Sequence, residues 1–229
     1  MVHRHADVPA ARRKGAPPPE QLDLEEVHLD SLDEAKVAVQ DCRRCPLYAN
    51  ATQAVFGEGT AGAEIMLVGE QPGDQEDLAG RPFVGPAGRV LDAALEAAGI
   101  DRSRVYVTNA VKHFKFQPRG KRRIHSKPNA GEIRACRFWL GLERELVRPR
   151  VIVAMGATAV ASLLGRSAAI GSLRGTATTL DDGTPMWVTV HPSYLLRITD
   201  RADAAEQRRR FEGDLRAIHD FVKGLPPRH

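Results

Sequence analysis

Short runs of apolar residues recur along the chain from residue 65 onward, and each run is only three or four residues long. The runs are Ile65–Val68, Val105–Val107, Val151–Ala154 and Trp187–Val190. Uninterrupted runs of this length, rich in β-branched residues, are typical of strands that are buried on both faces of a parallel sheet. We therefore predict a central sheet of four parallel strands.

Apolar residues at helical spacing separate these runs. One stripe begins at Val90 and Leu91, continues through Ala94 and Leu95, and is followed by Gly99, a helix stop signal. Similar patterns predict helices over residues 31–40, 130–146 and 157–164, and a C-terminal helix with the stripe Phe211, Leu215, Ile218 and Val222. Strands that alternate with helices predict a single α/β domain, with helices covering both faces of the sheet.

Composition narrows the class of protein. The chain has 229 residues, of which 42% are hydrophobic, and no apolar run approaches the roughly 20 residues that a membrane helix needs. Residues 1–21 are rich in Pro, Ala and Arg and lack apolar periodicity, so we predict a disordered basic tail before a domain over residues 22–229. They also lack the apolar core of a secretory signal. We expect a soluble, monomeric, cytoplasmic protein.

The most unusual segment is KRRIH, residues 121–125. Residues 112–127 contain seven Lys or Arg side chains, two phenylalanines and no acid, which suits a nucleic-acid backbone. Lys121, Arg122 and Arg123 are the candidate DNA contacts. His125 could be a nucleophile, a proton carrier or a metal ligand. From these residues alone, a solvated basic loop with a surface histidine is the simpler interpretation.

Each predicted strand runs into a distinctive loop. The first leads into GEQPGDQED (69–77) and then RPFVGPAG (81–88), where Pro86 suits the first turn of a helix whose free N–H groups can bind a phosphate or carbonyl oxygen. The second ends at Asn109, whose amide matches the edge of a nucleobase. The fourth ends in HPSYLLR (191–197), which begins with a possible oxyanion donor. Since ligands bind at the carboxyl ends of parallel strands, these loops are candidate site segments.

The cysteines point to a metal site. Cys42 and Cys45 form a CxxC pair and Cys136 lies far along the chain, which gives three of the four ligands of a tetrahedral site. His113 is the candidate fourth ligand. Soft thiolates suit zinc and iron–sulfur groups equally, so the residue types alone leave both open.

In this order, the motifs resemble those of the iron–sulfur uracil-DNA glycosylases (family 4), over about residues 32–222. GEQPGDQED is similar to the first motif of that family, GRPFVGPAG to its uracil-stacking segment, VTNAVK to its base-recognition strand end, and HPSYLLR to its second catalytic motif. KRRIH resembles the insertion of the X-type (UdgX-like) branch. Members of that branch excise uracil and become covalently attached to the abasic DNA.

The resemblance implies roles around a flipped uracil. Phe83 would stack on the base, Asn109 would recognise its Watson–Crick edge, and His191 would stabilise the negative charge that develops on uracil. The other residues expected to contact substrate or DNA are Gly69, Asp74, Ser193 and Arg197.

The resemblance also implies the reacting groups and a cofactor. His125 would attack the sugar C1′, and Glu70 and Gln71 would flank the sugar, with Glu70 orienting or deprotonating the imidazole. We expect that imidazole to lie at the tip of a hairpin-like insertion and to point into the uracil cavity. A 4Fe-4S cluster would be held by Cys42, Cys45, Cys136 and His113, which stands where the family has cysteine.

The expected function is therefore excision of uracil from single- or double-stranded DNA, with release of free uracil and trapping through His125. Gln71 stands where hydrolytic uracil glycosylases carry a water-activating aspartate, and an amide is no base at neutral pH. Two alternatives remain open. One is an ordinary turnover glycosylase in which KRRIH only grips DNA; the other is a non-catalytic nucleic-acid-binding module.

Overall fold

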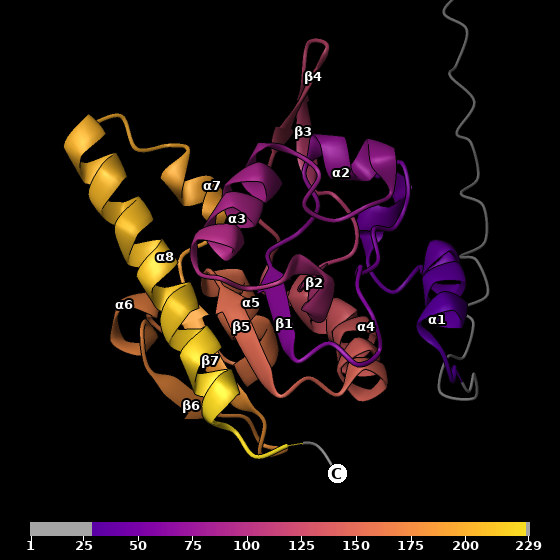
Figure 1. Cartoon of the computed structure of the whole chain (residues 1–229). Helices are drawn as coiled ribbons and strands as arrows, with labels where there is room; N and C mark the ends of the chain where they lie inside the picture. The colour runs from indigo at the N-terminus through magenta and orange to yellow at the C-terminus, as the bar shows by residue number, and fades with distance from the viewer. Residues whose placement is uncertain (1–28, 228–229) are drawn as a thin grey trace, which may run out of the picture.

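A five-stranded sheet with the order β2–β1–β5–β7–β6 forms the centre of the molecule (Figure 1). The strands are β1 (Ile65–Gly69), β2 (Val105–Asn109), β5 (Val151–Met155), β7 (Pro185–Thr189) and β6 (Ala177–Thr179). The first four are mutually parallel, whereas β6 pairs antiparallel with β7. The prediction of four strands is therefore wrong by one edge strand, and the sheet is mixed.

The computed structural model describes residues 29–227 of the chain. The predicted basic tail over residues 1–21 and the predicted domain start at residue 22 lie outside the described residues. Within the described part, no helix is long and apolar enough to cross a membrane.

Helices cover both faces of the sheet, as the alternating pattern predicts. α3 (Pro86–Ala97) and α8 (Arg201–Gly224) pack on one face, and α4 (Ala130–Val147) and α5 (Ala157–Leu164) pack on the other (Figure 1). The shorter helices are α1 (Leu32–Ala38), α2 (Asp74–Ala79), α6 (Ile170–Leu173) and α7 (Pro192–Leu195), with 3₁₀ turns at Val39–Asp41, Pro46–Ala49 and Arg102–Arg104.

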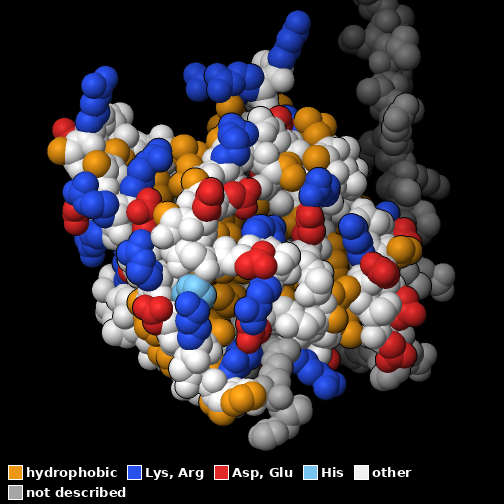
Figure 2. Space-filling model, viewed as in Figure 1, with side chains coloured by type: hydrophobic (Ala, Val, Ile, Leu, Met, Phe, Trp, Pro, Cys, Tyr) orange, Lys and Arg blue, Asp and Glu red, His pale blue; other side chains and the backbone are white. Residues whose placement is uncertain are grey.

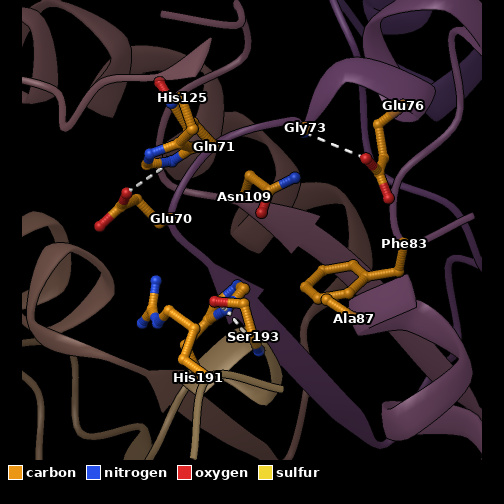
Figure 3. A pocket seen from close by; sticks show the side chains of 11 residues that line it. Glu70, Gln71, Gly73, Glu76, Phe83, Ala87, Asn109, His125, His191 and Ser193 are labelled. Carbon is orange, nitrogen blue, oxygen red and sulfur yellow. Dashed lines mark hydrogen bonds and ion pairs between the residues drawn. The ribbon is translucent and has the colours of Figure 1, made fainter. Parts of the chain in front are cut away.

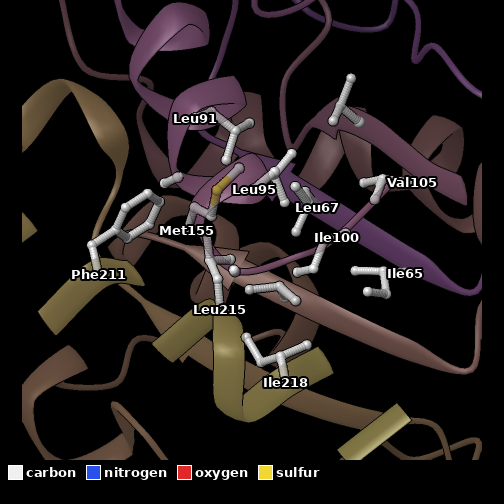
Figure 4. Close-up of a cluster of buried hydrophobic side chains, with 14 of the residues drawn as sticks. Ile65, Leu67, Leu91, Leu95, Ile100, Val105, Met155, Phe211, Leu215 and Ile218 are labelled. Carbon is white, nitrogen blue, oxygen red and sulfur yellow. The ribbon is translucent and has the colours of Figure 1, made fainter. Parts of the chain in front are cut away.

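The core explains why the strands are apolar throughout. In β1, Leu67 contributes to the cluster under α3 and α8, and its neighbour Met66 contributes to the cluster under α4 and α5. Both side chains have 0% exposure, so both faces of β1 lie in the core. Figure 4 shows the first cluster, which includes Leu67 of β1, Leu91 and Leu95 of α3, and Phe211 of α8.

The strand register brings the site segments together. Gly69 pairs with Asn109 at the ends of β1 and β2, and Met155 pairs with Thr189 at the ends of β5 and β7. All four parallel strands therefore end at one edge, which is called the carboxyl edge below. A two-stranded hairpin, β3 (Phe116–Arg119) and β4 (Arg122–His125), projects beyond this edge (Figure 1).

A candidate active site at the carboxyl edge of the sheet

A cavity of about 440 Å³ lies at the carboxyl edge. Glu70 after β1, Asn109 at the end of β2, Phe83 before α3, His125 at the end of β4 and His191 before α7 all line it (Figure 3). Its volume is within the roughly 300–1,000 Å³ that is usual for small-molecule sites. The strand-end loops that the sequence singled out therefore converge on one site.

Gly69 lies against three residues that line the cavity, and its lack of a side chain lets them approach one another. A Cβ at Gly69 would lie 2.4 Å from Asn109 Oδ1, 2.7 Å from Phe83 Cζ and 3.2 Å from His191 Nε2. Asn109 is only 3% exposed, and its side-chain amide makes no hydrogen bond within the described part of the chain. The amide lines the cavity, so its donor and acceptor are free to bind the edge of a base.

Phe83 is held in a conformation that a bulky residue rarely adopts. Its φ is 55°, in the left-handed region, at a cost on the order of 1–3 kcal/mol. Gly88 makes this conformation possible, since a Cβ there would lie 1.7 Å from the Phe83 carbonyl oxygen. The ring stands 6.0 Å from that of His191, at an interplanar angle of 30°. The loop thus presents a flat apolar wall to the cavity.

His191 is placed as a neutral hydrogen-bond donor. The Ser193 backbone N–H donates to Nδ1 at 3.2 Å, and Ser193 Oγ lies 2.9 Å from the same nitrogen. A nitrogen that accepts a backbone N–H carries no proton, so the proton of the neutral ring is on Nε2, the atom nearest Gly69. Burial lowers the pKa of His191 to about 4 despite the nearby charge of Glu70. The ring is therefore uncharged at neutral pH.

Glu70 links the hairpin to α5 through its two carboxylate oxygens. Its Oε1 lies 3.1 Å from His125 Nε2, and its Oε2 accepts a hydrogen bond from Thr158 Oγ1 at 2.6 Å (Figure 3). Burial alone would raise the pKa of Glu70, but the hydrogen bonds from His125 and Thr158 outweigh it and lower the pKa below its ordinary value. Glu70 is consequently a carboxylate at neutral pH.

His125 does not lie at the tip of the hairpin, so that expectation is wrong. It pairs with Phe116 at the open end of the ladder, next to the sheet, whereas Gly120 and Lys121 form the distal turn. The ring is 49% exposed and stands 6.3 Å from the Phe114 ring. The two strands thus anchor the imidazole at the mouth of the cavity, while the turn reaches outward.

Gln71 fastens both ends of the hairpin. Its Nε2 donates to the carbonyl oxygens of Lys115 and Ser126, and its Oε1 accepts from the Lys115 N–H, all at 3.1 Å. Lys115 precedes β3 and Ser126 follows β4, so a single amide closes the base of the hairpin. Gln71 also lines the cavity, although its polar atoms are taken by these three bonds.

Arg123 and Asp74 contact each other rather than the cavity. Arg123 Nε lies 2.5 Å from Asp74 Oδ1, and Nη1 lies 2.6 Å from Oδ2 of the buried Asp77. This clamp holds β4 against α2 and leaves Arg123 less able to bind phosphate than predicted. Lys121 and Arg122 are exposed, and Figure 2 shows Lys and Arg side chains gathered where the hairpin projects. Arg197 and Ser193 line the cavity.

Comparison with known proteins identifies the family. Residues 56–216 match the sequence model of the Uracil DNA glycosylase superfamily. The chain belongs to this superfamily. A Type-4 uracil-DNA glycosylase of Thermotoga maritima is 40% identical over 186 residues, which are 81% of this chain and 91% of the relative. A protein of the same name from Pyrobaculum aerophilum is 36% identical over 183 residues, 77% of this chain and 86% of the relative.

The cysteines of this superfamily member lie together, away from the cavity. Cys42, Cys45 and Cys136 have free thiols and pack in one cluster, and His113 is buried without a hydrogen bond among the described residues. The described side chains form no group of three or more His, Cys, Asp or Glu that could enclose a metal ion. The Lys112 N–H donates to Cys136 Sγ at 3.2 Å, as N–H groups do to metal-bound thiolates. The donor types therefore fit a thiolate-bound group, although the side chains would have to converge around it.

Glu76 is a structural residue of the glycosylase pocket that sequence analysis missed. Glu76 and Asp77 are buried, with 8% and 0% exposure. Glu76 Oε2 accepts the Gly73 N–H at 3.1 Å and Oε1 accepts the Gly85 N–H at 2.8 Å. One carboxylate therefore holds the loop after β1 against the loop that carries Phe83. No sequence signal shows this, because both partners are backbone groups.

Proposed function

We propose that this protein is a uracil-DNA glycosylase that excises uracil from DNA and remains covalently attached to the abasic sugar through His125. Membership of the superfamily and the Type-4 relatives support uracil excision. The observation that carries the trapping is the placement of His125. It lines the same cavity as Asn109, Phe83 and His191, and its Nε2 lies 3.1 Å from the Glu70 carboxylate.

Uracil must leave the base stack to enter this cavity. Flipping costs a few kcal/mol, and least when the base is unpaired or mispaired. Phe83 would offer its face for stacking, and the unpartnered amide of Asn109 would bind the Watson–Crick edge. A side chain at Gly69 would collide with both residues, so glycine keeps the space between them open. Cytosine would present the wrong donor pattern to that amide, and the methyl group of thymine would collide with a wall.

Cleavage separates charge between the sugar and the base. The electron pair of the bond between C1′ and the base leaves with uracil, whose oxygens then carry negative charge. His191, neutral and with its proton on Nε2, would donate to that charge without repelling a cation on the sugar. A preorganised donor of this kind lowers the activation free energy of bond cleavage by roughly 3–4 kcal/mol.

His125 would then bond to C1′ through its unprotonated ring nitrogen. The sugar loses its positive charge and the ring becomes a cationic imidazolium, while uracil later takes a proton from solvent. Glu70 is ionised and hydrogen-bonded to this ring, so it stabilises the imidazolium electrostatically. An alkylated imidazole is a poor leaving group without an acid, and the adduct would therefore persist.

We further propose that the thiol cluster holds a 4Fe-4S group. Its ligands would be Cys42, Cys45, Cys136 and His113. Burial raises the pKa of Cys136 to about 12, so a bound cation is needed to keep its sulfur ionised. The cluster lies apart from the cavity and would supply structural cross-linking of residues 42–45 to α4 rather than redox chemistry.

The decisive experiment incubates the purified protein with a uracil-containing single strand and resolves the products on a denaturing gel. We expect one protein–DNA band per active molecule and one free uracil released for each band. His125→Ala should abolish the band while some uracil release continues, and His219→Ala, at the opposite edge of the sheet, should behave as the parent. Several turnovers that are insensitive to His125 would establish the ordinary glycosylase instead. No uracil release at all would support the non-catalytic module.

A further inference from the structure

Lys112 and Glu143 form an ion pair directly behind the uracil cavity, with both side chains completely inaccessible to solvent. Lys112 Nζ lies 2.6 Å from Glu143 Oε2, and each side chain is 0% exposed. Burial of two such charges costs several kcal/mol per ion, which is recovered only when every remaining donor and acceptor is satisfied. A pair of this kind is a poor means of stabilising a core, and its hydrogen bonds point to another role.

Every polar atom of the pair has a partner. Glu143 accepts hydrogen bonds from the Gly57 N–H at 2.9 Å, the Tyr106 hydroxyl at 3.2 Å and Thr108 Oγ1 at 2.9 Å. Lys112 Nζ donates to Thr108 Oγ1 at 2.7 Å and to the Asn109 carbonyl oxygen at 2.8 Å, besides Glu143. Its three N–H donors therefore meet three acceptors. A fully satisfied buried network of this kind fixes one arrangement of its members.

The member of interest is Asn109, the residue proposed to recognise uracil. Its backbone carbonyl is held by Lys112, and the preceding Thr108 side chain is held by Glu143. The N–H groups of Ala110 and Val111 are bonded to the end of β1 at 3.0 Å each. The backbone around Asn109 is thus fixed on both sides, while its side-chain amide stays unbonded and faces the cavity (Figure 3).

We propose that Lys112, charged and paired with Glu143, is a positioning residue that sets the Asn109 amide for base recognition. This inference rests on the proposed function. Lys112 does not line the cavity, and Asn109 is the one cavity residue to which its ammonium group is hydrogen-bonded among the described residues, so we expect its effect on the base to pass through Asn109. The prediction is selective: removal of the pair should impair recognition of the base and leave binding of the DNA backbone unaffected.

The test uses the full-length double variant Lys112→Met/Glu143→Gln, which removes both charges and leaves no unpaired ion in the core. Affinity is measured for two oligonucleotides that differ at one position, a non-cleavable 2′-fluoro-2′-deoxyuridine in one and a tetrahydrofuran abasic analogue in the other. In the parent, uracil should bind more tightly than the analogue. In the variant we expect the preference for uracil to fall at least tenfold, while affinity for the analogue stays within twofold.

A matched control is Arg150→Met/Glu64→Gln, which neutralises another ion pair of the same sheet at the edge opposite the cavity. It should retain the parent preference at a comparable melting temperature. If the double variant at Lys112 and Glu143 loses stability but keeps the preference, the pair is merely structural and the inference is wrong. If the parent itself shows no preference for uracil, the proposed function fails instead.

A second, independent observation concerns a basic groove between α4 and α5. The groove has a volume of about 360 Å³ and is lined by Lys127, Arg134, Arg137 and Arg166, all exposed. Within the described part of the chain, no acidic side chain lines it and none of the four cations forms an ion pair. Four unpaired positive charges around one concave surface attract a polyanion.

The groove adjoins the proposed active site. Thr158, which donates to Glu70 from the other side of the cavity wall, lines the groove as well. Lys127 follows the hairpin by two residues, so the basic surface continues from the hairpin into the groove. A concave basic surface beside the site suits the phosphates and sugars of the strand that carries the extruded nucleotide. We infer that this groove holds the single-stranded DNA that flanks the extruded nucleotide.

Salt dependence tests this inference with single strands that carry the same non-cleavable uridine analogue. For single strands, log K falls against log salt with a slope of roughly 0.7 per phosphate contact, so Arg134→Gln/Arg166→Gln should reduce the slope by about 1.4. Arg216→Gln/Lys223→Gln removes two charges from α8 and should leave the slope unchanged. Shortening one flank of the oligonucleotide should abolish the difference between parent and variant. An unchanged slope in the groove variant overturns the inference. If the parent shows no preference for uracil over the abasic analogue, the proposed function is wrong instead.

Discussion

The hairpin anchor at Gln71 gives the sharpest prediction about trapping. Substitution by alanine removes three hydrogen bonds of 3.1 Å that tie Lys115 and Ser126 to the loop after β1. Each bond contributes about 1 kcal/mol net, so three of them hold the base of the hairpin by about 3 kcal/mol. Since about 1.4 kcal/mol corresponds to a factor of ten, the docked position of His125 could become up to about 100-fold less populated.

The remaining contacts limit the loss. The Ser126 N–H still donates to the Lys115 carbonyl at 2.9 Å, and Arg123 still clamps β4 to α2. We therefore expect Gln71→Ala to slow adduct formation by about 10- to 100-fold, on the energy scale given above. Uracil release, which depends on Asn109 and His191, should change by less than threefold. Both rates come from one single-turnover reaction, sampled for the protein–DNA band and for free uracil.

Gln53→Ala is the matched control, because Gln53 also donates two hydrogen bonds to backbone carbonyls, at the end of α2. It should trap DNA at the parent rate. Hydrogen exchange should show that residues 116–125 lose protection in Gln71→Ala and keep it in Gln53→Ala. If Gln71→Ala forms adduct as fast as the parent, the hairpin does not depend on this anchor and the reasoning is refuted.

Three further predictions follow from the same site. Glu70→Gln removes the charge that faces His125, so adduct should form at least tenfold more slowly on a denaturing gel, with folding intact by circular dichroism. Gly69→Ala places a methyl group against the Asn109 amide, and uracil-DNA affinity should fall at least tenfold while affinity for abasic DNA persists. His191 has a pKa of about 4 in the folded protein, against an ordinary 6.5. Between these pH values the imidazole is protonated in the unfolded chain and neutral in the folded protein. The free energy of unfolding should therefore decline as pH falls from about 6.5 to about 4, by up to about 3 kcal/mol, and urea titrations of His191→Gln should lack this component.

The four parallel strands could be predicted because a strand that is buried on both faces appears in the sequence as an uninterrupted apolar run. All residues of β1, β2 and β5 are buried, and each of these strands appeared as an apolar run. β6 has only three residues, Ala177–Thr179, of which the outer two are exposed. Such an edge strand needs no apolar run, since β7 supplies its hydrogen bonds. The fifth strand was therefore invisible in the pattern.

The site residues were predictable as a set, but their contacts were not. Asn109, Phe83, His191 and His125 share one cavity because the strand register aligns the loops that carry them. Arg123 was predicted to bind DNA, yet the structure pairs it with two carboxylates of α2. Such a pairing depends on how the hairpin leans over a helix about 50 residues earlier in the chain. The charges next to Arg123 in the sequence do not predict this contact between the hairpin and α2.

Glu70 explains how one site could either release or retain its product. The carboxylate is fixed by Thr158 on one oxygen and faces His125 with the other. It stabilises any cation that forms beside it, whether an oxocarbenium sugar or an alkylated imidazolium. The fate of the sugar is then decided by which nucleophile is held closest, and Gln71, bonded through all its polar atoms to the hairpin, offers no base to activate water. Under the proposed function, the amide that offers no base to water also holds the imidazole in place, so trapping would require no change in the electrostatics that cleave the bond.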